Sequence, residues 1–162
     1  MTLTYRQEYI DALGKENVPE VMLPQEWLLS MAGSLAPSSA SASASPNIHY
    51  RLLSHCTEKT NAPGSAKAWQ QVFHAFGLEL ELVPTGCCGM SGTYGHEARS
   101  LETSRTIYRQ SWQPLVDTAE DNSRLLATGY SCRSQVKRFS SVTLEHPLQA
   151  LLTHLRHHQT SP

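Results

Sequence analysis

Hydrophobic positions in the first part of the chain recur at helical spacing in two segments. Residues 4–13 carry Tyr5, Tyr9 and Leu13 on one face, which predicts a helix. Residues 18–23 predict a short strand, and Pro24 suits the first turn of a second helix with apolar positions three and four residues apart. We therefore expect residues 1–36 to form a helix, a strand and a helix within the same domain as the rest of the chain.

Further along, segments of strand periodicity alternate with segments of helical periodicity. Strands are predicted over residues 48–54, 78–82, 124–128 and 142–145, and helices over 66–76, 96–112, 133–139 and from residue 147 onward. Residues 78–82 alternate strictly between Leu and Glu, which is typical of a strand with one wet face. This alternation of elements predicts an α/β fold with a mostly parallel sheet flanked by helices.

Residues 37–46 contain only Ser, Ala and Pro, and such a stretch has little to bury. We interpret it as a linker or loop between residues 1–36 and a second part, residues 47–162. Residues 38–45 are expected to be exposed and poorly ordered.

Charge and composition exclude several classes of function. The 162 residues carry 13 Lys and Arg against 14 Asp and Glu, a net charge of −1, so a nucleic-acid partner is not expected. The chain contains no apolar run near the roughly 20 residues of a membrane helix. Its first residues also do not follow the pattern of a signal peptide. These features, together with four cysteines that suggest metal or redox chemistry, predict a cytoplasmic protein.

Each cysteine follows the end of a predicted strand. Cys56 follows the first of these strands, Cys87 and Cys88 the second, and Cys132 the third. Because the carboxyl ends of parallel strands share one edge of a sheet, we expect all four cysteines at that edge, within about 8 Å of one another. His146, at the end of the fourth predicted strand, is expected at the same rim. The competing interpretation is that each thiol simply fills the core.

Glycines recur every third residue around the adjacent cysteines, at Gly86, Gly89, Gly92 and Gly95. Such a run lets the backbone approach a ligand and offers its N–H groups to an anion, either a thiolate or a phosphate. The nucleotide-binding patterns G-x-G-x-x-G and G-x-x-x-x-G-K-[ST] are both missing from the sequence, which favours thiolates.

Soft thiolate ligands suit zinc or an iron–sulfur cluster. A structural zinc site usually contains C-x-x-C, which this sequence lacks, and adjacent cysteines fit one tetrahedral ion poorly. We therefore favour a multinuclear cluster, with zinc as the alternative and a strained Cys87–Cys88 disulfide ranked third. His55, His96 and His146 are candidates for contacts around such a group or for proton relay, although each is also compatible with a surface role.

The spacing of Cys56, then Gly86-Cys87-Cys88-Gly89, then Cys132 resembles the cysteine-rich CCG domain. That domain occurs in heterodisulfide reductase B subunits and glycolate oxidase iron–sulfur subunits. Residues 53–60, 86–97 and 127–135 are most similar to the C-terminal end of fused, FAD-linked D-lactate and D-2-hydroxyglutarate dehydrogenases. The resemblance extends over about residues 2–155.

This resemblance implies that Cys56, Cys87, Cys88 and Cys132 hold an iron–sulfur cluster, most simply 4Fe-4S, in an electron-transfer domain. Gly86, Gly89 and Gly92 would line the cofactor site. FAD and a ferredoxin-like portion would lie upstream in a larger polypeptide, and the electron acceptor is unidentified. The family motif ends in Cys-x-x-Cys, whereas Gln135 stands at the last position here.

Catalytic residues for a hydroxy acid are not expected in this chain, since neither a Ser-His-Asp order nor a paired-carboxylate motif stands out. The alternative function is a non-redox module that docks onto a larger oxidoreductase. Zinc or reduced thiols would then only hold its loops together.

Overall fold

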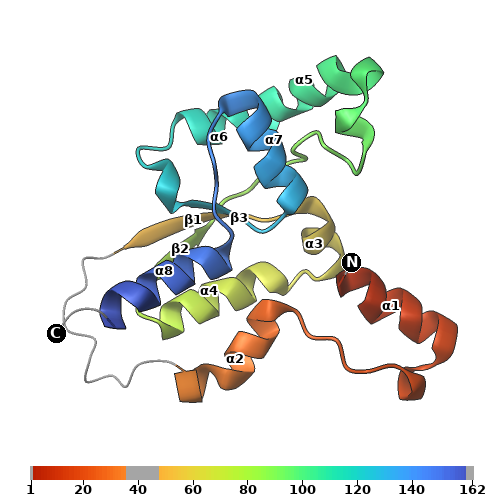
Figure 1. Cartoon of the computed structure of the whole chain (residues 1–162), viewed down its shortest axis with the longest axis vertical. Helices are drawn as coiled ribbons and strands as arrows, with labels where there is room; N and C mark the ends of the chain where they lie inside the picture. The colour runs from red at the N-terminus through yellow and green to blue at the C-terminus, as the bar shows by residue number, and fades with distance from the viewer. Residues whose placement is uncertain (1, 36–47, 160–162) are drawn as a thin grey trace.

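A three-stranded parallel sheet with the order β2-β1-β3 forms the centre of the molecule (Figure 1). The computed structural model describes residues 2–35 and 48–159, so the predicted linker over residues 37–46 lies outside the described residues. The strands are β1 (His49–Leu53), β2 (Glu79–Leu82) and β3 (Leu125–Ala127). The predicted α/β fold with a parallel sheet is confirmed.

The register of the sheet follows from its hydrophobic pattern. Leu52 of the central strand pairs with Leu82 on one side and with Leu126 on the other. All three residues of β3 are buried, whereas β2 buries Leu80 and exposes its two glutamates. The edge strand is thus exposed to solvent on one face, as its strict alternation of Leu and Glu predicts.

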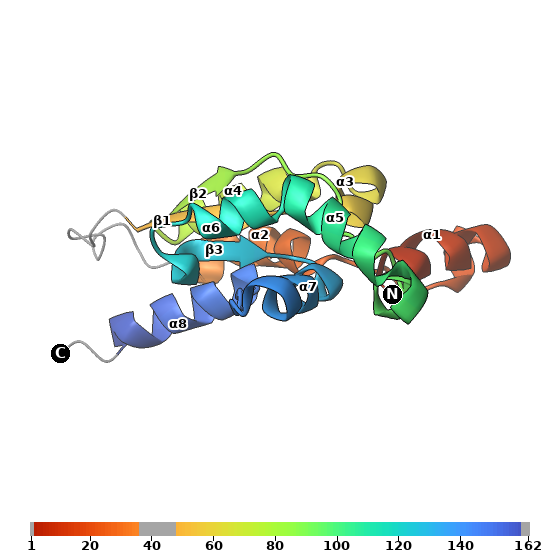
Figure 2. The same ribbon diagram turned by 90° about the horizontal axis from the view of Figure 1, so that it is seen from above.

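Helices cover both faces of the sheet (Figures 1 and 2). The helices are α1 (Thr2–Leu13), which lies away from the sheet, α2 (Pro24–Leu35), α3 (Cys56–Asn61), α4 (Ser65–Ala75), α5 (Leu101–Ser111), α6 (Gln113–Asp117), α7 (Tyr130–Ser140) and α8 (Pro147–Gln159). Single 3-10 turns lie at η1 (Lys15–Asn17), η3 (Tyr94–His96), η4 (Ala98–Ser100) and η5 (Asn122–Arg124). In the described part of the chain, no helix is both long and apolar enough to span a bilayer.

Two hydrophobic clusters lie on opposite sides of the sheet. One joins Tyr108, Trp112 and Val136 from α5–α7 to the two buried cysteines. The other joins Trp69 and Phe73 of α4 to residues of α8 and β2. Successive residues of a strand face opposite layers, so Leu53 belongs to the first cluster and Leu52 to the second.

Two predicted strands are wrong. Residues 18–23 do not pair with another strand, because the backbone N–H of Leu23 donates to Glu26 and its carbonyl accepts from the first turn of α2. Residues 142–145 make one parallel bridge, between Glu145 and Leu126, in which the N–H of Ala127 donates to the Glu145 carbonyl at 2.9 Å. Pro147 begins α8 directly afterwards, which leaves little room for a longer ladder.

Two helix boundaries also differ from the prediction. The helix expected from residue 96 begins at Leu101, because Glu97 is extended between the turns η3 and η4. The helix expected from residue 133 begins at Tyr130, which places Cys132 in its first turn. Cys56 likewise begins the short helix α3, where the sequence predicts a loop.

Candidate functional site

All four cysteines follow the carboxyl ends of the three strands. Cys56 comes three residues after the end of β1, Cys87 and Cys88 lie in the loop after β2, and Cys132 lies in the first turn of α7 after β3. Since the three strands are parallel, these segments meet at one edge of the sheet.

The thiols influence one another electrostatically at this edge. Cys88 and Cys132 each shift the pKa of the other, and Cys56 raises the pKa of both Cys87 and Cys132. Cys88 and Cys132 are buried in the core, Cys87 is half-buried and Cys56 is exposed. The group therefore runs from the interior to the surface.

Within residues 2–35 and 48–159, no three His, Cys, Asp or Glu side chains are arranged to hold a metal ion. The shared site for all four sulfurs stays a prediction.

The two buried thiols differ in pKa. The hydrogen bond from Cys132 lowers the pKa of Cys88, and the backbone N–H of Met90 adds to this effect against the cost of burial. Donating that bond, together with burial, raises the pKa of Cys132. Burial also raises the pKa of Cys87, although the N–H of Gly89 donates to its sulfur at 3.3 Å. Cys88 is therefore the thiol of this buried pair that ionises first.

The loop that carries Cys87 and Cys88 is held at its beginning. The N–H of Gly86 donates to the Ser111 hydroxyl at 2.7 Å, and the indole Nε1 of Trp112 donates to the Gly86 carbonyl at 3.1 Å. Lys59 of α3 donates to the Thr85 hydroxyl at 2.9 Å and to the Thr85 carbonyl. The ends of α3 and α5 therefore place the first cysteine of the loop.

The same loop is held beyond the cysteines at Gly89, which is buried and has a φ of 85°. The Ser104 hydroxyl donates to the Gly89 carbonyl at 2.8 Å and accepts a bond from Gln135 Nε2 at 2.7 Å. Both glycines that flank the cysteines are thus tied to neighbouring helices.

Two of the predicted site residues lie further along the loop. Gly92, with a φ of 63°, and His96 on η3 are both exposed. Their part in a cofactor site stays a prediction.

His55 lies beside the thiols. A Cβ added at Gly129 would lie 2.5 Å from the His55 ring and 2.9 Å from Cys132 Sγ, so glycine lets the ring and the sulfur approach each other. His55 Nε2 and the Ser131 hydroxyl are 3.3 Å apart, and burial lowers the pKa of His55. The imidazole is therefore held largely neutral next to Cys132.

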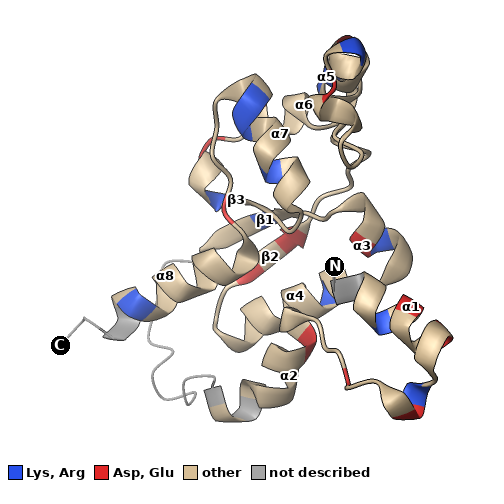
Figure 3. Cartoon of the chain, turned by 45° about the vertical axis from the view of Figure 1, so that its right-hand side comes forward, with Lys and Arg blue, Asp and Glu red and all other residues tan. Residues whose placement is uncertain are grey.

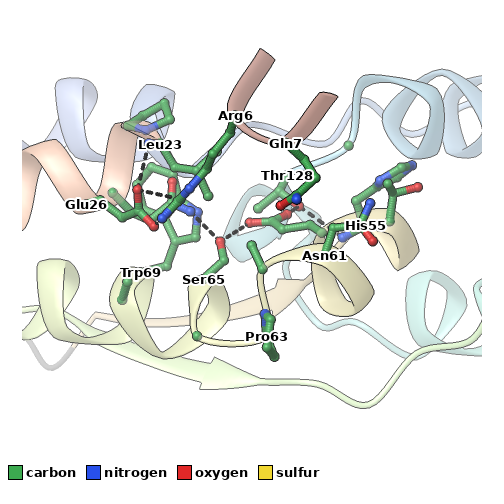
Figure 4. Close-up of a pocket in the computed structure, with 18 of the residues that line it drawn as sticks. Arg6, Gln7, Leu23, Glu26, His55, Asn61, Pro63, Ser65, Trp69 and Thr128 are labelled. Carbon is green, nitrogen blue, oxygen red and sulfur yellow. Dashed lines mark hydrogen bonds and ion pairs between the residues drawn. The ribbon is translucent and has the colours of Figure 1, made fainter. Parts of the chain in front are cut away.

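His55 and His146 both line a cavity of about 980 Å³ between α1, α2, α3 and α4. The close-up in Figure 4 shows Ser65 and Thr128 hydrogen-bonded to a carboxylate between them, that of Glu58. The His146 ring lies edge-on to Trp69, with 5.5 Å between ring centres. Burial, together with the charge of Arg133, lowers the pKa of His146 to about 4.

Sequence reasoning missed part of the support around the thiols. Ser104 and Ser111 carry no signal that separates a buried, bonded serine from an exposed one on a helix. Gln135 is conspicuous in the sequence only as a departure from a motif.

Comparison with known proteins gives several strong matches. The chain is 53% identical over 152 residues to D-2-hydroxyglutarate dehydrogenase from Pseudomonas putida. It is 46% identical over 153 residues to the protein of that name from Escherichia coli, and 42% identical over 160 residues to the one from Haemophilus influenzae. The chain resembles one short segment of these dehydrogenases. The matches cover 94%, 94% and 96% of this chain but only 14%, 14% and 16% of the relatives.

A more distant match covers part of the chain. A subunit of the anaerobic glycerol-3-phosphate dehydrogenase from Escherichia coli is 32% identical over 76 residues, which is 46% of this chain and 18% of that protein. No protein-family model matches the chain, and no solved structure does either. The resemblance to the CCG domain is therefore not supported by a family model, whereas the resemblance to dehydrogenases is supported by direct matches.

Proposed function

We propose that this chain is an iron–sulfur electron-transfer domain of a larger FAD-linked dehydrogenase that acts on a D-2-hydroxy acid such as D-2-hydroxyglutarate. The observation that carries the proposal is the meeting of four cysteines at the carboxyl edge of a parallel sheet, in a chain similar to a segment of such dehydrogenases. The flavin and ferredoxin-like portions would belong to the same polypeptide. We further propose that the protein is cytoplasmic.

Cys56, Cys87, Cys88 and Cys132 are the residues that would hold the cluster. A group that contains several irons accommodates the adjacent thiolates of Cys87 and Cys88 more easily than one tetrahedral ion does. When bound, an iron–sulfur cluster supplies a centre that accepts and releases single electrons.

The chain's own backbone suits a negatively charged group at this position. The N–H of Gly89 donates to Cys87, and the backbone at Met90 lowers the pKa of Cys88, so peptide dipoles stabilise negative charge on sulfur. Burial of Cys88 and Cys132 excludes water from the inner half of the site. The N–H donors favour sulfur in the thiolate form, which is the form that binds metal, whereas burial opposes it.

The basic residues near the cysteines are engaged at strand ends. Arg133 donates to the carbonyls of Ala127 and Thr128 at 2.8 and 3.1 Å, and Lys59 binds Thr85. These cations hold the segments that lead into the cysteines while their charge remains near the site. Figure 3 shows the Lys and Arg positions scattered over several helices.

Anaerobic loading of the chain with ferrous iron and sulfide tests the proposal. We expect a brown protein whose broad visible absorption bleaches on reduction, with about four irons and four sulfides per chain. Cys87→Ser and Cys88→Ser are each expected to abolish loading, because a neutral hydroxyl replaces a soft thiolate ligand poorly. Ser134→Ala, on the same helix turn as Cys132, is the matched control and should load normally.

Unchanged iron and sulfide in both cysteine variants would exclude the adjacent pair from the site. A colourless protein that binds zinc stoichiometrically would instead support the alternative, a non-redox docking module of a larger oxidoreductase.

A further inference from the structure

A buried series of hydrogen bonds joins α7, α5 and the loop that carries Cys87 and Cys88. Gln135 Nε2 donates to Ser104 Oγ at 2.7 Å, and Ser104 Oγ donates to the Gly89 carbonyl at 2.8 Å. The side chains of Gln135 and Ser104 are both completely buried. This series of hydrogen bonds thus reaches Gly89, the residue directly after Cys88, without contact with solvent.

The hydrogen-bonding pattern sets the orientation of the Gln135 amide. A serine hydroxyl has one proton, which Ser104 gives to Gly89, so Ser104 can only accept from the amide nitrogen. The amide oxygen of Gln135 therefore faces elsewhere, and it has no hydrogen-bond partner among the described residues. A buried acceptor without a partner costs about 1–3 kcal/mol, so this amide is a poor choice for stability alone.

The amide lies directly against the peptide of Gly89. A Cβ added at Gly89 would lie 2.3 Å from the Ser104 carbonyl oxygen and 3.2 Å from Gln135 Nε2. The two faces of this stretch of backbone have different partners. The carbonyl of Gly89 accepts from Ser104, while the N–H of Gly89 donates to Cys87 Sγ at 3.3 Å.

We propose that Gln135 is a positioning residue for the thiol site. Through Ser104 it fixes the Gly89 carbonyl, and this keeps the N–H of the same residue on the sulfur of Cys87. Gln135 does not need to touch the bound group itself. The inference rests on the proposed function for the identity of that group, and on the described contacts for the position of the peptide.

Gln135→Met separates this role from a merely structural one. Methionine keeps a similar volume and removes both the donor and the unpaired oxygen, so the free energy of unfolding should stay the same or rise. The Ser104 hydroxyl, which donates to the Gly89 carbonyl, nevertheless loses the amide that holds it in place. We expect amide hydrogen exchange over residues 86–91 of the iron-free chain to become about fivefold faster, as the loss of one hydrogen bond implies.

In the loaded chain, the same substitution should weaken the N–H donors to sulfur. Fewer such bonds leave the bound group more electron-rich, so its reduction potential should fall and its electron paramagnetic resonance spectrum should change. Ser104→Ala, the second variant, removes the hydroxyl in the middle of this series of hydrogen bonds. It should shift the reduction potential in the same direction. The double variant should exchange no faster than Ser104→Ala alone, because the two residues act in series.

Gln25→Met is the matched control. Gln25 is also a buried glutamine whose Nε2 donates to a serine hydroxyl, that of Ser65, but it lies between α2 and α4 on the other side of the sheet. Its substitution should leave the exchange rates of residues 86–91, the potential and the spectrum unchanged.

The outcomes distinguish this inference from the proposed function. If the unsubstituted chain binds iron, and Gln135→Met alters neither exchange nor potential, the inference is overturned while the proposed function stands. Faster exchange with an unchanged potential and spectrum also overturns it, since Gln135 would then be structural only. If the unsubstituted chain binds no iron, the proposed function fails, and the exchange rates alone decide whether Gln135 holds the Gly89 peptide.

Discussion

At the scale of single residues, two glycines of the cysteine loop share a left-handed backbone but differ in their surroundings. Gly89 has a φ of 85°, and its missing Cβ would lie 2.3 Å from the backbone oxygen of Ser104. Gly92 has a φ of 63° and open space around the same position. Both glycines relieve backbone strain, but only Gly89 also permits a close approach of two segments.

Gly89→Ala and Gly92→Ala separate these two effects. Each alanine costs about 1 kcal/mol for the left-handed conformation. At Gly89, overpacking against a backbone oxygen adds about 1–3 kcal/mol. Denaturant unfolding should therefore show a clearly larger loss of stability for Gly89→Ala than for Gly92→Ala. Equal losses for the two variants would mean that the loop shifts without cost to admit the new methyl group.

His146 links stability to pH. Its pKa in the folded chain is about 4, below the usual 6.5, because of burial and then the charge of Arg133. The neutral ring also accepts a bond from the Leu148 N–H at 3.2 Å. As the pH falls from 6.5 towards 4, the unfolded chain takes up this proton before the folded one, so stability decreases over that window.

After allowance for partial solvent screening, this loss is on the order of 2 kcal/mol. Denaturant unfolding at pH 7 and pH 4.5 measures it. His146→Asn should flatten this part of the pH dependence, whereas His74→Asn, at an exposed position on α4, should leave it unchanged. An identical slope in His146→Asn and the unsubstituted chain would contradict the assignment.

At the scale of elements, the junction of α5 and α6 supports both the core and the cysteine loop. Trp112, at this junction, is fully buried and donates its indole N–H to the Gly86 carbonyl. The side chain of Ser111, one residue earlier, accepts from the Gly86 N–H. The end of one helix thus fixes both polar groups of the glycine before Cys87.

Trp112→Phe keeps an aromatic ring but removes the donor and part of the volume. We expect a loss of about 2 kcal/mol, from one hydrogen bond and a small cavity, measured by thermal or denaturant unfolding. Trp27→Phe, on α2 and 50% exposed, is the control and should change stability by less than about 0.5 kcal/mol. A similar small change at both positions would show that the α5–α6 junction tolerates the smaller ring.

At the scale of the whole molecule, α1 is attached weakly to the α/β domain. From Thr4 to Leu13 its side chains are exposed except for half-buried Ile10. Arg6 binds Glu26 of α2 at 2.7 Å, in a pair that is 44% and 31% exposed. An exposed ion pair contributes about 0–1 kcal/mol, so α1 adds little to the stability of the domain.

Removal of residues 1–13 should therefore lower the free energy of unfolding by no more than about 1 kcal/mol. Arg6→Ala in the full chain should produce most of the same change. Trp69→Ala, which empties the core beneath α4, should cost about 3–5 kcal/mol in the same assay. A loss of several kcal/mol without α1 would indicate that the helix stabilises the domain through contacts beyond this pair.

The alternation of strands and helices was determined by local sequence pattern. Period-two positions in β2 and period-3.6 positions in α4 depend only on neighbours along the chain, so the α/β class and the placement of cysteines after strand ends follow from the sequence. Residues 142–145 look like a strand for the same local reason. In the structure they make only one bridge, between Glu145 and Leu126, because pairing with a strand far away in the sequence depends on tertiary packing.

The internal order of the thiol site was decided by tertiary structure. The sequence predicts four cysteines at one edge, but which of the two buried thiols, Cys88 or Cys132, ionises first depends on how α7 packs against the loop after β2. Gln135 and Ser104 lie 31 residues apart and act on Gly89 through one shared hydroxyl. Hydrogen bonds between distant segments leave no periodic trace in the sequence, because their partners are chosen by the packing of helices against the sheet and not by neighbouring residues.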